Sequence, residues 1–264
     1  MIKVAVVTSF LLIGFLAKAQ EFQGKAEYYS KRFFKNEIGT KPDDEPELKK
    51  AYEDALKKAS ENRFILTFNK KEALFEKQES LEKPTPNNAK VTVTMTFSGQ
   101  GKTYINTKDK VRITEDDILG KEFLIVDSLK VFKWKLTDET RKIGEYTCYK
   151  AETLIPVSEK EKKEYEEYLK KQNTTSFFTM EEPKEKKIVV WYTPEVPVSV
   201  GPSNYWGLPG LILEVNDGET VVLCSKLTLN NKETAKIKVP HVGKEVSQDE
   251  FDTIHKDILE SMDH

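Results

Sequence analysis

Histidine and cysteine are scarce in this 264-residue sequence, which contains three histidines and two cysteines. Zinc and copper sites need such side chains at close spacing, but His241, His255 and His264 have no other histidine or cysteine within one helical turn. The sequence also lacks a Gly-x-Ser-x-Gly elbow, a phosphate-binding glycine loop and a dinucleotide fingerprint. We therefore expect no metal and no cofactor, and the sequence assigns no catalytic residue.

The sequence also has no large excess of one charge: it contains 42 basic and 44 acidic residues, which give a net charge of −2. A nucleic-acid-binding protein would need a concentrated basic face, so no nucleic-acid partner is expected. Acidic residues are so numerous that some carboxylates will lie close together by chance. A glycosidase-type pair is thus neither indicated nor excluded, and an enzyme of unrecognised type stays open as an alternative.

Long apolar runs are absent beyond the N-terminal segment. That segment joins a short basic start, an apolar stretch at residues 4–16 and the small-residue sequence Ala17-Lys18-Ala19, which is the pattern of a signal peptide. The apolar stretch is shorter than the roughly 20 residues that span a bilayer. We therefore expect residues 1–19 to be a signal peptide and residues 20–264 to form a single domain without a transmembrane span. The mature chain would be periplasmic or extracellular.

Export would bring Cys148 and Cys224 into an oxidising compartment, where disulfides persist. Each cysteine lies in a predicted strand and precedes a lysine by two residues, a shared pattern that lets both side chains face the same way. The sequence leaves two alternatives open, a Cys148–Cys224 disulfide or two separately buried thiols. A catalytic thiol is not favoured, because no histidine lies near either cysteine in the sequence.

Short segments of alternating apolar and polar residues dominate the rest of the chain and predict antiparallel strands. The expected strands lie at residues 24–30, 64–68, 72–76, 91–97, 102–106, 108–113, 122–126, 146–154, 188–192 and 211–215, with a charged turn after Leu136 and a returning strand that begins at Val221, after a turn at residues 216–218. Helices are expected at residues 46–60, after a Ser158–Glu161 capping box, and near the C-terminus after a Ser247–Glu250 capping box. The pattern predicts a mainly β (α+β) fold: a curved antiparallel sheet or half-barrel with a few peripheral helices, including a C-terminal helix.

Residues 201–215, GPSNYWGLPGLILEV, have the most constrained backbone in the chain. Pro209-Gly210 has the chemistry of a type II turn, in which the glycine takes a positive φ, and the apolar run after it predicts a buried strand. Tyr205 and Trp206 lie in a rigid loop before this turn. We expect the loop to cover one end of a β core. The alternative is a loop that contacts a ligand or a partner, because rigid loops with exposed aromatic residues are favoured recognition sites.

The candidate ligand- or partner-binding residues are Tyr205, Trp206 and Leu208 in this loop, with Trp191 before it and Glu214 after it. Glu214 stands out because it interrupts an apolar run, although an ordinary position on the solvated face of a hairpin also explains it. The expected ligand is an apolar small molecule, and the expected partner is a protein of the cell envelope.

Four stretches in this order make the chain resemble the GLPGLI family of exported bacterial proteins. They are the motif itself at residues 207–212, GKAEYY at residues 24–29, WKLTDETRKIGEYTCYKA at residues 134–151 and VVWYTPEVPVSVGP at residues 189–202. The resemblance implies export and no assigned activity, so no functional residue carries over from the family. It does not imply a Cys148–Cys224 bridge either, since Cys224 lies beyond the motif.

Three hypotheses for function follow from the sequence. The first is a non-enzymatic envelope protein whose groove holds an apolar ligand or a segment of a partner, and an apolar, aromatic-lined cavity would support it. The second is a structural or interaction protein of the envelope, which an exposed apolar patch or sheet edge would support. The third is an enzyme, which would need convergent acids or a histidine in a cleft.

Overall fold

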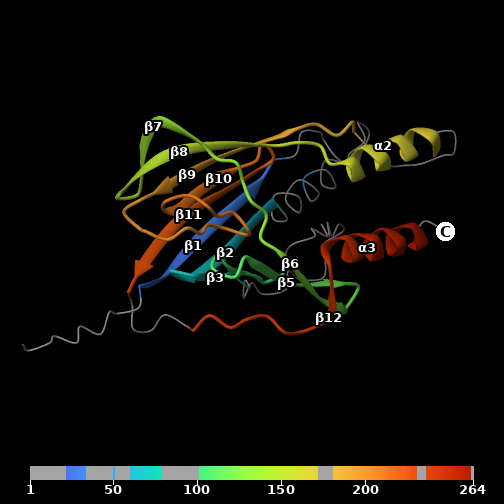
Figure 1. Ribbon diagram of the computed structural model, residues 1–264, viewed down its shortest axis with the longest axis horizontal. Coiled ribbons are helices and arrows are strands. Elements are labelled where there is room, and N and C mark those ends of the chain that lie inside the picture. Colours follow the sequence, from blue (N-terminus) through green and yellow to red (C-terminus); the bar gives the residue numbers. More distant parts are fainter. Residues whose placement is uncertain are drawn as a thin grey trace, which may run out of the picture.

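The computed structural model describes residues 22–33, 50, 60–78, 101–171, 181–230 and 236–262. These residues form one sheet of twelve strands and two helices, one of them near the C-terminus (Figure 1). The predicted mainly β fold is therefore confirmed, and the sheet is open. Neither of these helices is long and apolar enough to cross a membrane. The expected signal peptide, the helix at residues 46–60 and the strand at residues 91–97 fall mostly or wholly outside the described residues.

The strands and helices are numbered in chain order. Their bounds are β1 Gln23–Arg32, β2 Glu61–Asn69, β3 Glu72–Lys77, β4 Thr103–Asn106, β5 Val111–Ile118, β6 Lys121–Ser128, β7 Lys135–Ile143, β8 Tyr146–Ile155, α2 Glu159–Lys171, β9 Lys186–Thr193, β10 Leu211–Asn216, β11 Thr220–Leu229, β12 Lys244–Val246 and α3 Gln248–Met262.

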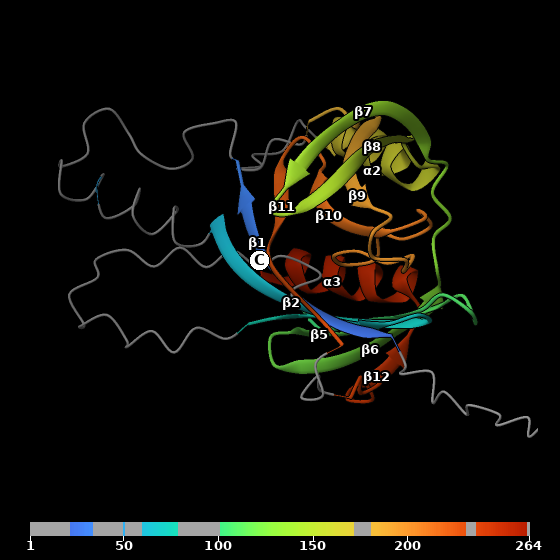
Figure 2. The same cartoon turned by 90° about the vertical axis from the view of Figure 1, so that its left-hand side faces the viewer.

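Two antiparallel meanders make up the sheet, and β1 joins them. The strand order is β12-β6-β5-β4-β3-β2-β1-β11-β10-β9-β8-β7, in which the short β12 pairs with β6 in parallel. The sheet curves so that β7 to β10 lie in one layer and β2, β5 and β6 in another (Figures 1 and 2). This curvature lets one sheet enclose a core, as predicted from the short alternating segments.

The central strand β1 shows the expected period of two. Gly24, Ala26, Tyr28 and Ser30 are buried, and the residues between them are partly exposed. The buried Tyr28 hydroxyl donates a hydrogen bond of 2.6 Å to the carbonyl of Ile212 in β10, which satisfies both groups away from water. A single polar contact thus ties the centre of the sheet to the strand that follows Pro209-Gly210.

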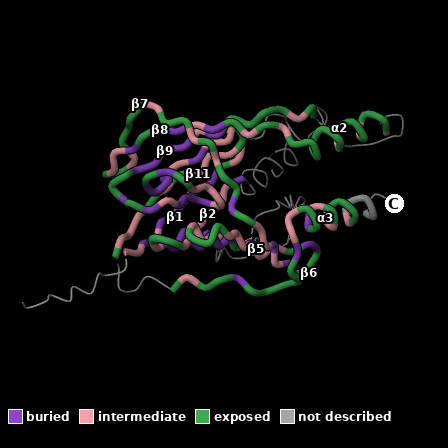
Figure 3. The backbone as a smooth tube through the Cα atoms, in the orientation of Figure 1, coloured by how far each residue is buried: buried purple, intermediate pink, exposed green. Residues whose placement is uncertain are grey.

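Three clusters of buried side chains form the core. The first joins Ala26, Tyr28, Leu66, Phe68, Ala73, Phe75, Ile105, Leu129, Cys148, Val196, Val198, Val200, Leu211 and Leu213. The second, on β8 to β10, joins Ala151, Ile188, Val190, Tyr192, Leu208, Ile212 and Val215. The third, under α3, joins Ile118, Phe123, Ile125, Val246 and Phe251. Figure 3 shows that buried residues concentrate on β8, β9 and the inner strands.

The strand predicted after Pro209-Gly210 is present as β10, and its apolar residues are buried as expected. The reason for glycine at position 210 differs from our prediction, because Gly210 is not among the glycines with positive φ. A Cβ atom there would instead lie 2.2 Å from the carbonyl oxygen of Thr193. The residue is required because β9 and the turn approach each other closely, a constraint that the local sequence does not reveal.

The predicted charged turn after Leu136 is wrong. Residues 137–142 belong to β7, and the turn lies at Gly144-Glu145. The segment lacks apolar alternation because it is the outermost strand of the sheet, where most side chains on both faces are exposed. Its pairing with β8 also shifts register between Leu136 and Thr140, so the strand is irregular there.

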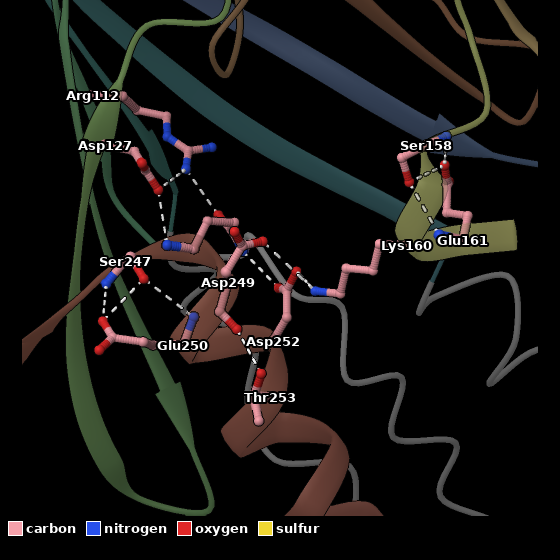
Figure 4. Close-up of polar contacts among 11 residues, drawn as sticks. Arg112, Asp127, Ser158, Lys160, Glu161, Ser247, Asp249, Glu250, Asp252 and Thr253 are labelled. Carbon is pink, nitrogen blue, oxygen red and sulfur yellow. Dashed lines mark hydrogen bonds and ion pairs between the residues drawn. The ribbon is translucent and has the colours of Figure 1, made fainter. Parts of the chain in front are cut away.

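Both predicted capping boxes are present at the helix N-termini (Figure 4). At α2, the Glu161 N–H donates to Ser158 Oγ at 3.1 Å, and the Ser158 N–H donates to the Glu161 carboxylate at 2.7 Å. At α3, Ser247 and Glu250 make the same two bonds at 3.2 and 2.7 Å. The hydrogen bonds from the serines lower the pKa of Glu161 and of Glu250. Local spacing alone predicted these contacts correctly.

Helix α3 is held on β6 by an apolar stripe and by polar contacts at its start. Phe251 packs against Phe123 with ring centroids 5.4 Å apart. The Gln248 N–H donates to Asp127 Oδ2 at 2.8 Å. Lys160 of α2 pairs with Asp252 of α3 at 2.7 Å, which joins the two helix starts (Figure 4).

Gly210→Ala should lower the free energy of unfolding by about 3 kcal/mol, because a buried methyl group would collide with the Thr193 carbonyl. Gly120→Ala is the matched control, since Gly120 has a φ of +79° but nothing within 4 Å of an added Cβ. That control should cost about 1 kcal/mol from backbone strain alone. Urea unfolding followed by circular dichroism measures both values, and equal losses would contradict the close-approach explanation.

Candidate functional site

The loop that carries the predicted aromatic residues is clamped to the segment between β6 and β7. The Trp206 Nε1–H donates to the Lys130 carbonyl at 2.8 Å, and the Trp134 Nε1–H donates to the Trp206 carbonyl at 2.8 Å. Each indole N–H thus satisfies a backbone carbonyl of the other segment. The ring of Phe132 lies 5.2 Å from that of Trp134 and 5.3 Å from that of Tyr205, which closes an aromatic cluster.

Three of the predicted binding residues belong to this clamp or to the core beneath it. Leu208 is 2% exposed and lies in the second core cluster. Tyr205 packs against the same cluster, and burial raises the pKa of its hydroxyl to about 12. The Lys110 ammonium lies 4.6 Å from the centre of the Trp206 ring. The structure therefore gives these residues internal partners, which favours a loop that covers the core.

The other two predicted residues, Trp191 and Glu214, are directly opposite each other on β9 and β10. Arg141 of β7 joins them, because its guanidinium lies 4.1 Å from the centre of the Trp191 ring and forms an ion pair with Glu214. The Glu214 side chain is only 14% exposed, so this pairing offsets part of the cost of removing its charge from water. The sequence did not reveal Arg141, which lies 73 residues from Glu214.

Beside Trp191, Glu214 and Arg141, the neighbouring charged side chains also form ion pairs with one another. Lys150 pairs with Glu139 at 2.7 Å and with Glu152 at 3.1 Å, and Lys187 pairs with Glu152 at 2.9 Å. Hydrogen bonds donated by Lys187 and Lys150 lower the pKa of Glu152, and the hydrogen bonds that Lys150 donates to Glu139 and Glu152 raise the pKa of Lys150. Both pKa shifts favour the charged forms of Lys150 and Glu152 at neutral pH, so neither of these two groups is suited to proton transfer there.

The five predicted residues do not converge on one site. Val190 and Tyr192, which flank Trp191 on β9, lie in the second core cluster with Tyr205 and Leu208. Successive side chains of a strand point to opposite faces of the sheet. Trp191 therefore points to the opposite face of β9 from the cluster that holds Tyr205 and Leu208, and it packs against the first core cluster, as Trp206 does.

The two cysteines are free thiols that share the first core cluster, Cys148 within it and Cys224 packed against it. Burial raises the pKa of Cys148 to about 11 and that of Cys224 to about 12. A thiolate at Cys148 would raise the pKa of Cys224 further. A nucleophilic cysteine needs a thiolate near neutral pH, so these thiols are poorly suited to catalysis.

The exposed edge of the sheet at β7 is a feature that sequence patterns missed. Among the described residues, no strand pairs with β7 on its outer side. Leu136 is 55% exposed and lies directly opposite Ala151 on β8. Tyr149, two residues from Ala151 and 38% exposed, shares that face. We call Leu136 and Tyr149 the apolar strip. Figure 3 shows β7 as mostly exposed.

Metal-ligating side chains do not gather in the part of the chain that the structure describes: no group of three or more His, Cys, Asp or Glu is placed to hold an ion there.

The two cysteines should resist iodoacetamide in the folded protein at about pH 8, because their raised pKa values leave almost no thiolate. Unfolding in guanidinium without a reductant should then give two carbamidomethyl groups by mass spectrometry. Two adducts in the folded protein would contradict the burial of the thiols, and none after unfolding would establish a disulfide. The free energy of unfolding should also fall as pH rises above about 8.5, since the unfolded state releases the thiol protons first.

Comparisons with known proteins gave one match to a family model and several matches to solved structures. Residues 134–214 match a family model described as a protein of unknown function (Porph_ging), and this match covers less than a third of the chain. No curated protein matches the chain. Two structures of PNGF-II, in the C2 and P21 space groups, match with a TM-score of 0.47 each. Identity is 18% and 17%, and the matches cover 89% of this chain but 32% and 33% of the PNGF-II chain. The chain thus spans about a third of the length of PNGF-II.

Proposed function

We propose that this protein is a non-enzymatic component of the bacterial cell envelope, of the GLPGLI type, which binds an extended segment of a partner polypeptide. The single observation that carries the proposal is the long, exposed β7 edge with the apolar strip beside it. The N-terminal signal-like segment and the four family-like stretches support export and the family assignment.

An extended segment binds well to such an edge for physical reasons. An edge strand carries a row of backbone N–H and C=O groups that lack a neighbouring strand, and an added strand satisfies them. Alternate side chains of the added strand then lie along one face of the sheet. Here Leu136, on β7 itself, would lie beside those side chains, and Tyr149, on the adjacent strand β8, would face them across β7, so the apolar strip supplies affinity and selectivity beyond the backbone pairing.

A small apolar ligand inside the sheet is less well supported. Tyr28, Phe68 and Leu66 are among the largest fully buried side chains, and they fill the centre of the first core cluster. Of the candidate binding residues, Leu208 belongs to the second cluster and Tyr205 packs against it. A ligand in either place would have to displace side chains that already make close contacts, at a cost in stability.

Export can be tested directly. The protein recovered from a periplasmic or secreted fraction of its own cells should have the intact mass of a chain that begins at Gln20, because cleavage is expected after Ala19. Ala19→Leu should block this cleavage and leave the precursor with the membrane fraction. Recovery of the whole protein in the cytosolic fraction with Met1 or Ile2 at its start would contradict export.

Partner binding at the β7 edge predicts position-dependent photo-cross-linking in living cells. Replacing Leu136 or Tyr149 by a benzophenone amino acid should yield protein adducts on irradiation, because these side chains would contact the bound segment. Lys121, which is exposed on β6, is the control position and should yield none.

Two results would count against the proposal. Lipid-sized adducts alone at positions 136 and 149 would show that a small apolar ligand occupies the strip. The same protein adduct at position 121 would show that the contacts are unspecific.

A further inference from the structure

Along β7, acidic residues precede basic ones. Asp138 and Glu139 come first, Thr140 follows, and Arg141 and Lys142 come next. The strand therefore has an acidic half and a basic half arranged around a neutral centre. All four charged residues are exposed, and they lie on the outermost strand of the sheet.

This order is complementary to itself when two copies run antiparallel. With Thr140 opposite Thr140 of a second copy, Glu139 lies opposite Arg141, and Asp138 lies opposite Lys142. Each pair occurs twice because the arrangement has a two-fold axis. Opposite charges directly across an antiparallel pair are stabilising, and like charges there are destabilising. Parallel pairing in the same register would place acid beside acid and base beside base.

We propose that the polypeptide bound at the β7 edge is the β7 strand of a second copy of this chain, which pairs antiparallel about Thr140. This inference rests on the proposed function, because it names the partner of the same edge. A two-fold contact of this kind closes on itself, so the assembly stops at a dimer. The two sheets then become continuous across the shared edge.

The ion pairs within one chain are compatible with this arrangement. Arg141 is held over Trp191 and beside Glu214, and a guanidinium carries five N–H donors, so it can contact Glu139 of the second copy as well. Glu139 already pairs with Lys150 at 2.7 Å. The Lys142 ammonium donates to the Glu145 carbonyl at 3.3 Å. The Asp138 and Lys142 positions can therefore be exchanged without removing the Arg141–Glu214 pair.

The irregular register between Leu136 and Thr140 limits the strength of the contact. It bends the strand, as edge irregularities commonly do, and shortens the stretch that can pair flat. Exposed ion pairs contribute modestly and are screened by salt. We therefore expect a weak dimer that dissociates on dilution and in high salt.

Charge exchange on β7 tests the proposal by sedimentation velocity on the chain that begins at Gln20. The wild type should shift from monomer to dimer as its concentration rises at low salt. Asp138→Lys and Lys142→Asp should each weaken the dimer about tenfold, because each places like charges opposite one another twice. The double variant Asp138→Lys/Lys142→Asp should restore wild-type association, and an equal mixture of the two single variants should form a mixed dimer.

Lys121→Asp changes the net charge by the same amount as Lys142→Asp at an exposed site on β6, and it should leave the dimer unchanged. Melting temperatures close to that of the wild type confirm that each variant folds. A wild type that stays monomeric, a double variant that does not recover, or equal weakening by Lys121→Asp would overturn the proposal.

The same data separate this inference from the proposed function. A monomeric wild type that still gives protein cross-links from position 136 would exclude the second copy and leave the edge as a site for another polypeptide. A monomer without cross-links would overturn both.

Discussion

A sheet that does not close must end in edge strands, and this constraint governs the molecule. One edge is β12, which pairs with β6 over only three residues. The other is β7, which runs for nine residues and is exposed along most of its length. Backbone groups at such an edge are satisfied by water or by another strand, so natural proteins either protect long edges or use them. Charged residues and an irregular register give β7 a partly protected edge.

The centre of the sheet, in contrast to the exposed β7 edge, is closely packed. Gly210 allows the turn before β10 to approach the Thr193 carbonyl, and the Tyr28 hydroxyl bonds the Ile212 carbonyl within the core. The reciprocal indole hydrogen bonds of Trp134 and Trp206 then hold the aromatic loop against the segment before β7. Most of these residues lie in the stretches that carry the resemblance to the GLPGLI family, and they build and brace the core. This explains why the motif indicated a fold without indicating a reaction.

Local patterns predicted the parts of the fold that depend on neighbours in sequence. The capping boxes at Ser158 and Ser247 and the alternation in β1 are determined by residues a few positions apart, and all three are present. Features that depend on distant residues were missed. Gly210 meets Thr193, and Arg141 joins Trp191 to Glu214, only after β7, β9 and β10 come together. The β7 strand was missed because an edge strand exposed on both faces needs no apolar alternation.

Hydrogen–deuterium exchange of the β7 backbone tests the central claim, that this edge pairs with the same edge of a second copy. In dilute protein, the amides of residues 135–143 that point away from β8 should exchange rapidly, because no described strand covers them. In concentrated protein at low salt, exchange in this segment should slow while exchange in β12, at the opposite edge, stays unchanged. An identical exchange rate of β7 under both conditions would contradict the account.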